Sequence, residues 1–116
     1  MMKRLLPLEE SLLIKILGKS PQLRIVDFFL DNRSWDFSKK EIIEEIKMSR
    51  NTFYKVWDYI ENLDIVRITR KFGNVKLYQL NKNNPLVQML IKLDERLMIE
   101  ATEKIPIEEK ISSQKK

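Results

Sequence analysis

Two helix-start signals stand eleven residues apart in this chain, at Ser38 and Ser49. Ser38 is followed three residues later by Glu41, which makes a capping box. The hydroxyl accepts a backbone N–H near the helix start, and the carboxylate accepts the N–H of Ser38. Phe37 and Ile42 flank this cap as a hydrophobic staple. Eleven residues leave room for one short helix and a tight turn, so the spacing predicts a helix-turn-helix.

The helix that begins at Ser49 has an apolar face and a polar face. Met48 before the cap and Phe53 after it repeat the staple. The apolar residues recur at steps of three and four and predict a face packed on the core: Phe53, Val56, Ile60 and Leu63. The polar face gathers side chains that contact bases in the major groove: Arg50, Asn51, Thr52, Tyr54 and Lys55. An inert solvated face is the alternative interpretation, and the residue types favour DNA over it.

The next segment is predicted to be a β-hairpin. Residues 66–69 alternate apolar and polar side chains, and residues 75–78 do the same, with Tyr78 on the polar side. Gly73 and Asn74 supply the turn between the two strands. The period of two indicates strands that are buried on one face only.

The net charge of +5 is concentrated on this hairpin. Residues 65–82 carry five Lys or Arg side chains and no acid, and the charges of the other 98 residues cancel. A basic hairpin beside a capped helix is the pattern expected of a phosphate-binding surface. A charged strand edge that prevents aggregation is a second interpretation, and both can hold at once.

The stretch SKKEIIEEIKMSRNTFYKVWDYIENLDIVRITRKFGNVKLYQL, residues 38–80, resembles the winged helix-turn-helix of small prokaryotic regulators, most closely archaeal members of the MarR and ArsR type. The resemblance implies a mainly α fold with a small β-hairpin wing and additional N- and C-terminal helices. It also implies that the helix over residues 49–63 faces the major groove and that residues 70–76 form the wing. The family often has glycine after each of the two helices, where this chain has Lys47 and Asp64. A left-handed backbone at these positions carries a steric cost.

Phosphate contacts are expected from the starts of the two helices and from the hairpin. The residues are Ser49, Lys39, Lys40, Arg67, Arg70, Lys71, Asn74 and Lys76. Phosphate contacts carry no sequence information, so sequence specificity is expected from the polar face of the second helix.

Two helices are predicted before this segment. Residues 7–17 place leucines at helical spacing, and two glutamates interrupt the apolar run that a secretion signal needs. We therefore expect an amphipathic helix in a cytoplasmic protein. Ser20 caps a second helix, whose apolar residues predict a place in the core: Leu23, Ile25, Val26, Phe28, Phe29 and Leu30. Trp35 and Phe37 are expected to pack beneath the loop that follows.

The last helix is predicted over residues 85–103, with Asn84 as its cap and Pro85 at its first position. Its leucines step by four, three and four residues along one face: Leu86, Leu90, Leu93 and Leu97. Such a stripe on a small domain is typical of an interface. We therefore expect a two-fold homodimer, with or without Leu12 and Ile16 of the first helix. A helix folded over its own core is the alternative.

Composition narrows the domain organisation and the function class. A chain of 116 residues, 43% hydrophobic and 34% charged, suits one small domain. We expect this domain over residues 1–104, followed by a flexible polar tail over residues 105–116. The chain has no cysteine, no histidine and two glycines, so we expect no catalytic residue, no cofactor and no metal site. No apolar run has membrane-spanning length.

These features favour a dimeric, sequence-specific regulator of transcription that binds double-stranded DNA and is not an enzyme. Two alternatives are compatible with the same fold. One is an architectural or partition protein that coats DNA. The other is a winged helix that contacts protein in a transcription or replication assembly. The cations of the hairpin favour DNA over a protein partner, and a small-molecule effector leaves no mark in the sequence.

Overall fold

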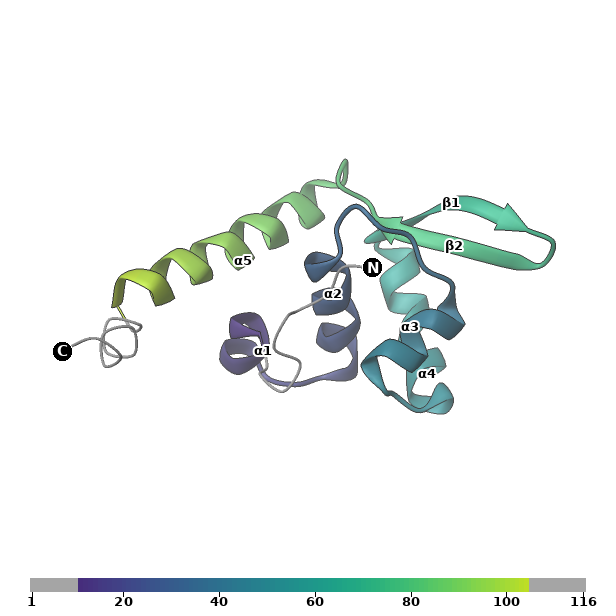
Figure 1. The fold of residues 1–116 in the computed structure, drawn as a ribbon, viewed down its shortest axis with the longest axis horizontal. Helices are drawn as coiled ribbons and strands as arrows, with labels where there is room; N and C mark the ends of the chain where they lie inside the picture. Colours follow the sequence, from purple (N-terminus) through teal and green to yellow (C-terminus); the bar gives the residue numbers. More distant parts are fainter. Residues whose placement is uncertain (1–10, 105–116) are drawn as a thin grey trace.

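The computed structural model describes residues 11–104, which form five helices and one β-hairpin (Figure 1). In chain order the elements are α1 Leu12–Leu17, α2 Pro21–Asp31, α3 Lys39–Ile46, α4 Arg50–Asn62, β1 Val66–Phe72, β2 Val75–Leu80 and α5 Pro85–Lys104. This mainly helical order with a small antiparallel hairpin confirms the predicted fold class. The tail predicted over residues 105–116 lies outside the described residues. None of the described helices is both long and apolar enough to cross a membrane.

Serine caps begin the first four helices. The hydroxyl oxygen accepts the backbone N–H three residues on, at 3.0–3.1 Å, in each of Ser11, Ser20, Ser38 and Ser49. At α3, Glu41 Oε1 also accepts the N–H of Ser38 at 2.8 Å, which confirms the predicted capping box. Ser11 has an extended backbone and α1 starts at Leu12, whereas residues 7–10 of the predicted helix lie outside the described residues. Asn84 starts α5 as predicted, and its Oδ1 accepts the N–H of Leu86 at 2.8 Å.

The core lies where α2, α4 and the base of the hairpin meet. Phe28 of α2 packs edge-on against Phe37, with 4.7 Å between the ring centroids. Phe53 stacks on Trp57 within α4 at 4.9 Å, and Trp57 meets Tyr78 of β2 edge-on at 5.1 Å. All five side chains are buried in one cluster, and full burial of a large apolar side chain contributes about 1.5–3 kcal/mol. This cluster holds α4 against both α2 and the hairpin.

Three residues lie elsewhere than the sequence predicted. Trp57 belongs to the buried face of α4, which the predicted stripe omitted. Leu63 is 55% exposed because α4 ends one residue earlier and helical spacing no longer applies. Trp35 is 48% exposed, whereas Phe37 is buried as predicted. The N–H of Trp35 donates to the Asn32 carbonyl at 3.1 Å, and this turn leaves the indole at the surface.

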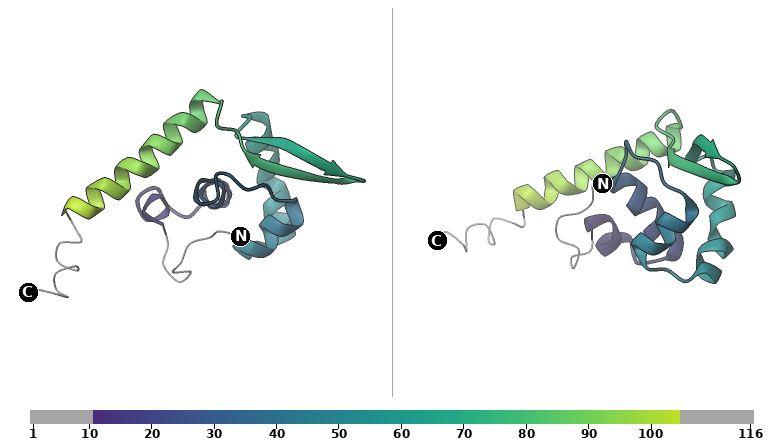
Figure 2. Two further views of the ribbon diagram at one scale, coloured as in Figure 1. Left: turned by 45° about the horizontal axis from the view of Figure 1, so that its top comes forward. Right: turned by 45° about the vertical axis from the view of Figure 1, so that its right-hand side comes forward.

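The hairpin and α5 run in opposite directions from the short connection that joins them (Figure 2). Helix α5 contacts α1. Val87 is fully buried, and Leu90 and Leu97 pack partly against the core, but Leu86 and Leu93 stay exposed. The predicted leucine stripe is therefore divided between the chain's own core and its surface. The alternative of a helix folded over its own core therefore describes only part of α5, and the homodimer stays a prediction.

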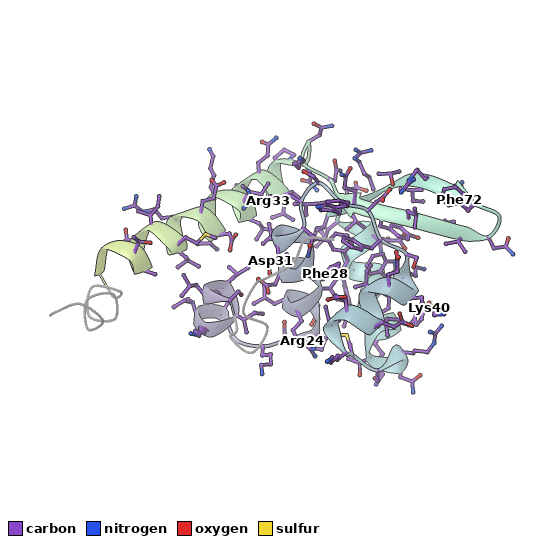
Figure 3. The ribbon with its side chains drawn as sticks, viewed as in Figure 1. Arg24, Phe28, Asp31, Arg33, Lys40 and Phe72 are labelled. Carbon is purple, nitrogen blue, oxygen red and sulfur yellow. The ribbon has the colours of Figure 1, made fainter. Side chains whose placement is uncertain are left out.

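An ion pair ties α5 to the connection between α2 and α3. One guanidinium nitrogen of Arg33 lies 3.3 Å from Asp94 Oδ2, and the other lies 3.1 Å from Glu95 Oε2. Figure 3 shows Arg33 between α2 and α5. Burial raises the pKa of the Asp94 carboxyl, and the charge of Arg33 opposes this shift. The pair therefore offsets part of the cost of burying a carboxylate on the covered side of α5.

Within residues 11–104, two non-glycine residues have left-handed backbones. Lys47 ends α3 with φ 55° and ψ 47°, and Asp64 follows α4 with φ 56°. These are the positions at which the resembled family often has glycine. A Cβ in this region is crowded by the following carbonyl, and Asp tolerates the conformation better than Lys. The turn between α3 and α4 is therefore strained at Lys47.

We expect Lys47→Gly to stabilise the protein by about 0.5–1 kcal/mol, because it removes this crowding at some cost in chain entropy. Asp64→Gly is the matched control and should gain less. The measurement is the free energy of unfolding from urea titration, followed by circular dichroism. A Lys47→Gly protein less stable than the wild type would contradict this account of the turn.

Candidate nucleic-acid interface

The start of α4 exposes most of the predicted base-contacting residues. Arg50, Asn51, Tyr54 and Lys55 lie on one face of the helix and are all exposed. Thr52 belongs to the same turn, and its hydroxyl accepts a hydrogen bond from Ser49 Oγ at 2.9 Å. The structure thus brings four of the five predicted residues together at the surface. The side chains of Thr52 and Ser49 are engaged in the helix cap.

Lys39 joins three elements at this surface. Its ammonium lies 5.4, 5.8 and 5.9 Å from the ring centroids of Tyr54, Trp57 and Tyr78. Attraction between a cation and an aromatic face at this distance holds the start of α3 against α4 and β2. The guanidinium of Arg50 lies 5.8 Å from the same Tyr54 ring. An exposed aromatic ring between two cations is therefore positioned near the start of α4.

Tyr78 occupies the buried junction between β2 and α4. Burial raises the pKa of its hydroxyl, and the neighbouring Glu61 carboxylate adds to this shift. The hydroxyl therefore stays protonated at neutral pH. The sequence pattern predicts Tyr78 on the polar side of its strand, but the side chain is buried.

The error arises because both faces of β2 are covered at this point, and β1 contains a bulge opposite it. Ile68 pairs with Tyr78, but the next pair is Arg70 with Leu77, so Thr69 is the extra residue. Directly paired residues of two strands point to the same face of the sheet. Beyond Ile68, the side chains of β1 therefore alternate between the faces one residue out of step with the predicted pattern. Leu77 and Tyr78 are both buried, on opposite faces of the hairpin. Ile68 is exposed, although its strand pattern predicts a half-buried side chain.

The bulge also divides the basic residues between the two faces of the hairpin. Lys71 and Lys76 are direct partners, two residues along β2 from Tyr78, and therefore lie on the face that packs against α4. Arg67 and Arg70 lie on the other face, where Arg67 donates to Gln79 Oε1 at 2.9 Å. The basic residues of the hairpin that were predicted to contact phosphates therefore do not lie on one surface.

Arg70 forms an ion pair that the sequence did not predict. Its Nε and NH2 groups donate to the two carboxylate oxygens of Asp36, each at 2.9 Å. Thr69, at the bulge, donates its hydroxyl to Asp36 Oδ2 at 2.5 Å. Asp36 belongs to the connection between α2 and α3, 34 residues away in sequence. No local pattern signals this contact, because it depends on how the hairpin folds back.

The remaining predicted phosphate contacts lie at the surface. Lys40 is exposed in the first turn of α3, and Asn74 is exposed in the two-residue turn of the hairpin. Figure 3 shows Lys40 on α3 and Phe72 towards the tip of the hairpin. The guanidinium of Arg70 lies 5.5 Å from the Phe72 ring, so this aromatic lies on the face away from the lysine pair.

The hydrogen bonds from Arg70 are the largest cause of a lowered pKa at Asp36, below the ordinary value of 3.8. We therefore expect Arg70→Gln to raise the pKa of Asp36, measured from its carboxyl carbon by NMR. A carboxyl with a lowered pKa stabilises the fold above its unfolded pKa, and this contribution is lost as pH falls through the folded pKa. The stability gap between wild type and Arg70→Gln should therefore close only below pH 3.8. A gap that closes well above that pH would contradict the assignment.

The architecture has counterparts among solved structures. MepR, a transcription regulator of the Staphylococcus aureus multidrug efflux pump MepA, superposes with a TM-score of 0.57 at 10% identity, over 87% of this chain and 77% of MepR. A MarR family protein from Bacillus stearothermophilus superposes with a TM-score of 0.55 at 18% identity, over 89% of this chain and 72% of its own length. No protein-family model and no curated protein sequence matches the chain. The fold of this chain is therefore the winged helix-turn-helix of MarR-type proteins.

Proposed function

We propose that this protein is a homodimeric, sequence-specific regulator of transcription that binds double-stranded DNA. One observation carries the proposal. The face of the hairpin that packs on α4 continues outward as the Lys71–Lys76 pair. We infer that the exposed start of α4 and these two cations of the hairpin belong to one side of the molecule. MepR, which shares this fold, is a transcription regulator and supports the same assignment.

The Lys71–Lys76 pair is assigned to DNA phosphates. Like charges directly opposite each other in a sheet destabilise it. Among the ion pairs of the described residues, none includes Lys71 or Lys76. A phosphate between the lysines would relieve their repulsion. Lys39, Lys40 and Asn74 are proposed as further phosphate contacts because they lie at the helix start and at the hairpin turn.

The exposed face of α4 is assigned to base edges. Arg pairs well with guanine and Asn with adenine in the major groove, which gives Arg50 and Asn51 the clearest roles. Tyr54 and Lys55 extend the same face. Thr52 and Ser49 contribute less in this proposal, since their side chains are bonded to each other.

The DNA test separates the two assignments. Lys71→Gln/Lys76→Gln should weaken binding to every sequence and reduce the slope of log K against log salt by about 1.8. Asn51→Ala should cost about 1–3 kcal/mol on the preferred site and much less on unrelated DNA. Lys92→Gln on α5 is the control, because it removes one positive charge away from the proposed surface, and it should change neither quantity. If the double variant keeps the wild-type salt slope, Lys71 and Lys76 do not contact DNA phosphates.

A homodimer is proposed because one winged helix contacts few base pairs. Two copies related by a two-fold axis place their α4 helices about 34–36 Å apart and match an inverted repeat. The candidate seam on α5 is its exposed apolar face, formed by Leu86, Met89 and Leu93. Leu90, Leu97 and Leu12 are partly packed within the chain, so we assign them a smaller share than the sequence suggested. Ile16 is 64% exposed and stays a candidate on α1.

The dimer test replaces Leu86 and Leu93 with Glu. Charge in an apolar seam opposes association through desolvation and repulsion, so sedimentation should change from a dimer to a monomer, with weaker DNA binding. Both side chains are exposed in the single chain, so circular dichroism should not change. Lys92→Glu places the same charge elsewhere on α5 and should leave the dimer intact. A wild type that sediments as a monomer at micromolar concentration would rule out the seam.

A further inference from the structure

The acid that contacts the hairpin is held more firmly than the arginine it binds. Asp36 precedes Phe37, whose backbone N–H and C=O both bond to Tyr78 of β2 at 2.8 Å. The Thr69 hydroxyl donates to the same carboxylate. The Asp36 side chain is 17% exposed, whereas that of Arg70 is 57% exposed. Asp36 is therefore a fixed acceptor, and Arg70 is a long side chain drawn back onto it.

The pair occupies the groups that Arg70 would use on DNA. Guanidinium recognition of a carboxylate or a phosphate uses two parallel N–H donors, and here Nε and NH2 both point at Asp36. A DNA phosphate can accept hydrogen bonds from these two donors only by displacing the Asp36 carboxylate. The Asp36 charge also cancels one of the five positive charges that residues 65–82 carry. Exposed ion pairs contribute little to folding, so charge balance is the larger effect of this one.

We propose that Asp36 limits sequence-independent DNA binding by withholding Arg70 from DNA phosphates. The inference rests on the proposed DNA-binding function and assigns a residue outside the helix-turn-helix and the hairpin to its regulation. Sequence-independent affinity comes from phosphate contacts and the counterions they release. One fewer contact lowers the affinity for unrelated DNA and shortens the time spent on it.

The experiment is a double-mutant cycle on a duplex of random sequence, measured by fluorescence anisotropy over a range of salt. Asp36→Asn should raise the affinity roughly five- to tenfold at about 0.1 M salt and steepen the salt slope by about 0.9, because Arg70 gains one phosphate. Asp36→Asn/Arg70→Gln should return both quantities to wild-type values. Asparagine keeps an acceptor oxygen for Thr69, and circular dichroism checks that each variant is folded.

The control is Glu44→Gln, which removes an equal charge from the exposed surface of α3 and should change the affinity by less than about twofold. An Asp36→Asn protein with unchanged or weaker binding overturns the inference. So does a double variant that binds less tightly than wild type with a shallower slope, because Arg70 would then already contact phosphate in the wild type. A wild type that binds no DNA overturns the proposed function and this inference together, whereas DNA binding with an unresponsive Asp36 overturns the inference alone.

Discussion

Two backbone hydrogen bonds between Phe37 and Tyr78, each of 2.8 Å, join the segment before α3 to strand β2. They form an isolated bridge beside the two-stranded hairpin. On one side of this bridge Phe37 packs against Phe28, and on the other Tyr78 packs against Trp57. The orientation of the hairpin relative to α4 therefore depends on a short backbone contact that is covered by aromatic side chains. Buried backbone bonds are costly to leave unmade, so this junction resists rearrangement.

The proposed DNA surface follows from this junction. Because Tyr78 is held against α4, the face of β2 that contains it also directs Lys76 towards the side of α4. Lys39 lies over the rings of the same junction. Asp36 stands next to the bridge and reaches the opposite face of the hairpin, where it holds Arg70. This junction thus divides the basic residues of the hairpin between a lysine face and an arginine face, on which Asp36 neutralises Arg70.

Local features of the sequence predicted most of the fold. The caps at Ser38 and Ser49 depend on residues three positions apart, and both are present. Asn84 at α5 and the Gly73–Asn74 turn are equally local. The sequence patterns did not predict contacts between residues that are far apart in the chain. The bulge at Thr69 and the Asp36–Arg70 pair arise only when the hairpin packs on the α2–α3 connection, and no spacing rule contains that information.

Helix α5 shows a second limit of sequence patterns. Steps of three and four among its leucines predict an apolar face, but they do not say which neighbour covers it. Val87 and Leu90 turn to the chain's own core, whereas Leu86 and Leu93 remain at the surface. The buried Asp94 with its partner Arg33 also lies on the covered side. A buried carboxylate within an apolar stripe indicates packing against a specific partner rather than a uniform seam.

The most direct test of the central claim maps the DNA contact on the protein itself. Backbone amide shifts of the ¹⁵N-labelled protein can be followed by NMR while duplex DNA is added. The account predicts the largest changes at Asn51, Tyr54, Lys71 and Lys76, with small changes at Leu13 and Trp35. Changes concentrated on α1 or α5, with α4 and the hairpin unaffected, would contradict the claim that this face binds DNA.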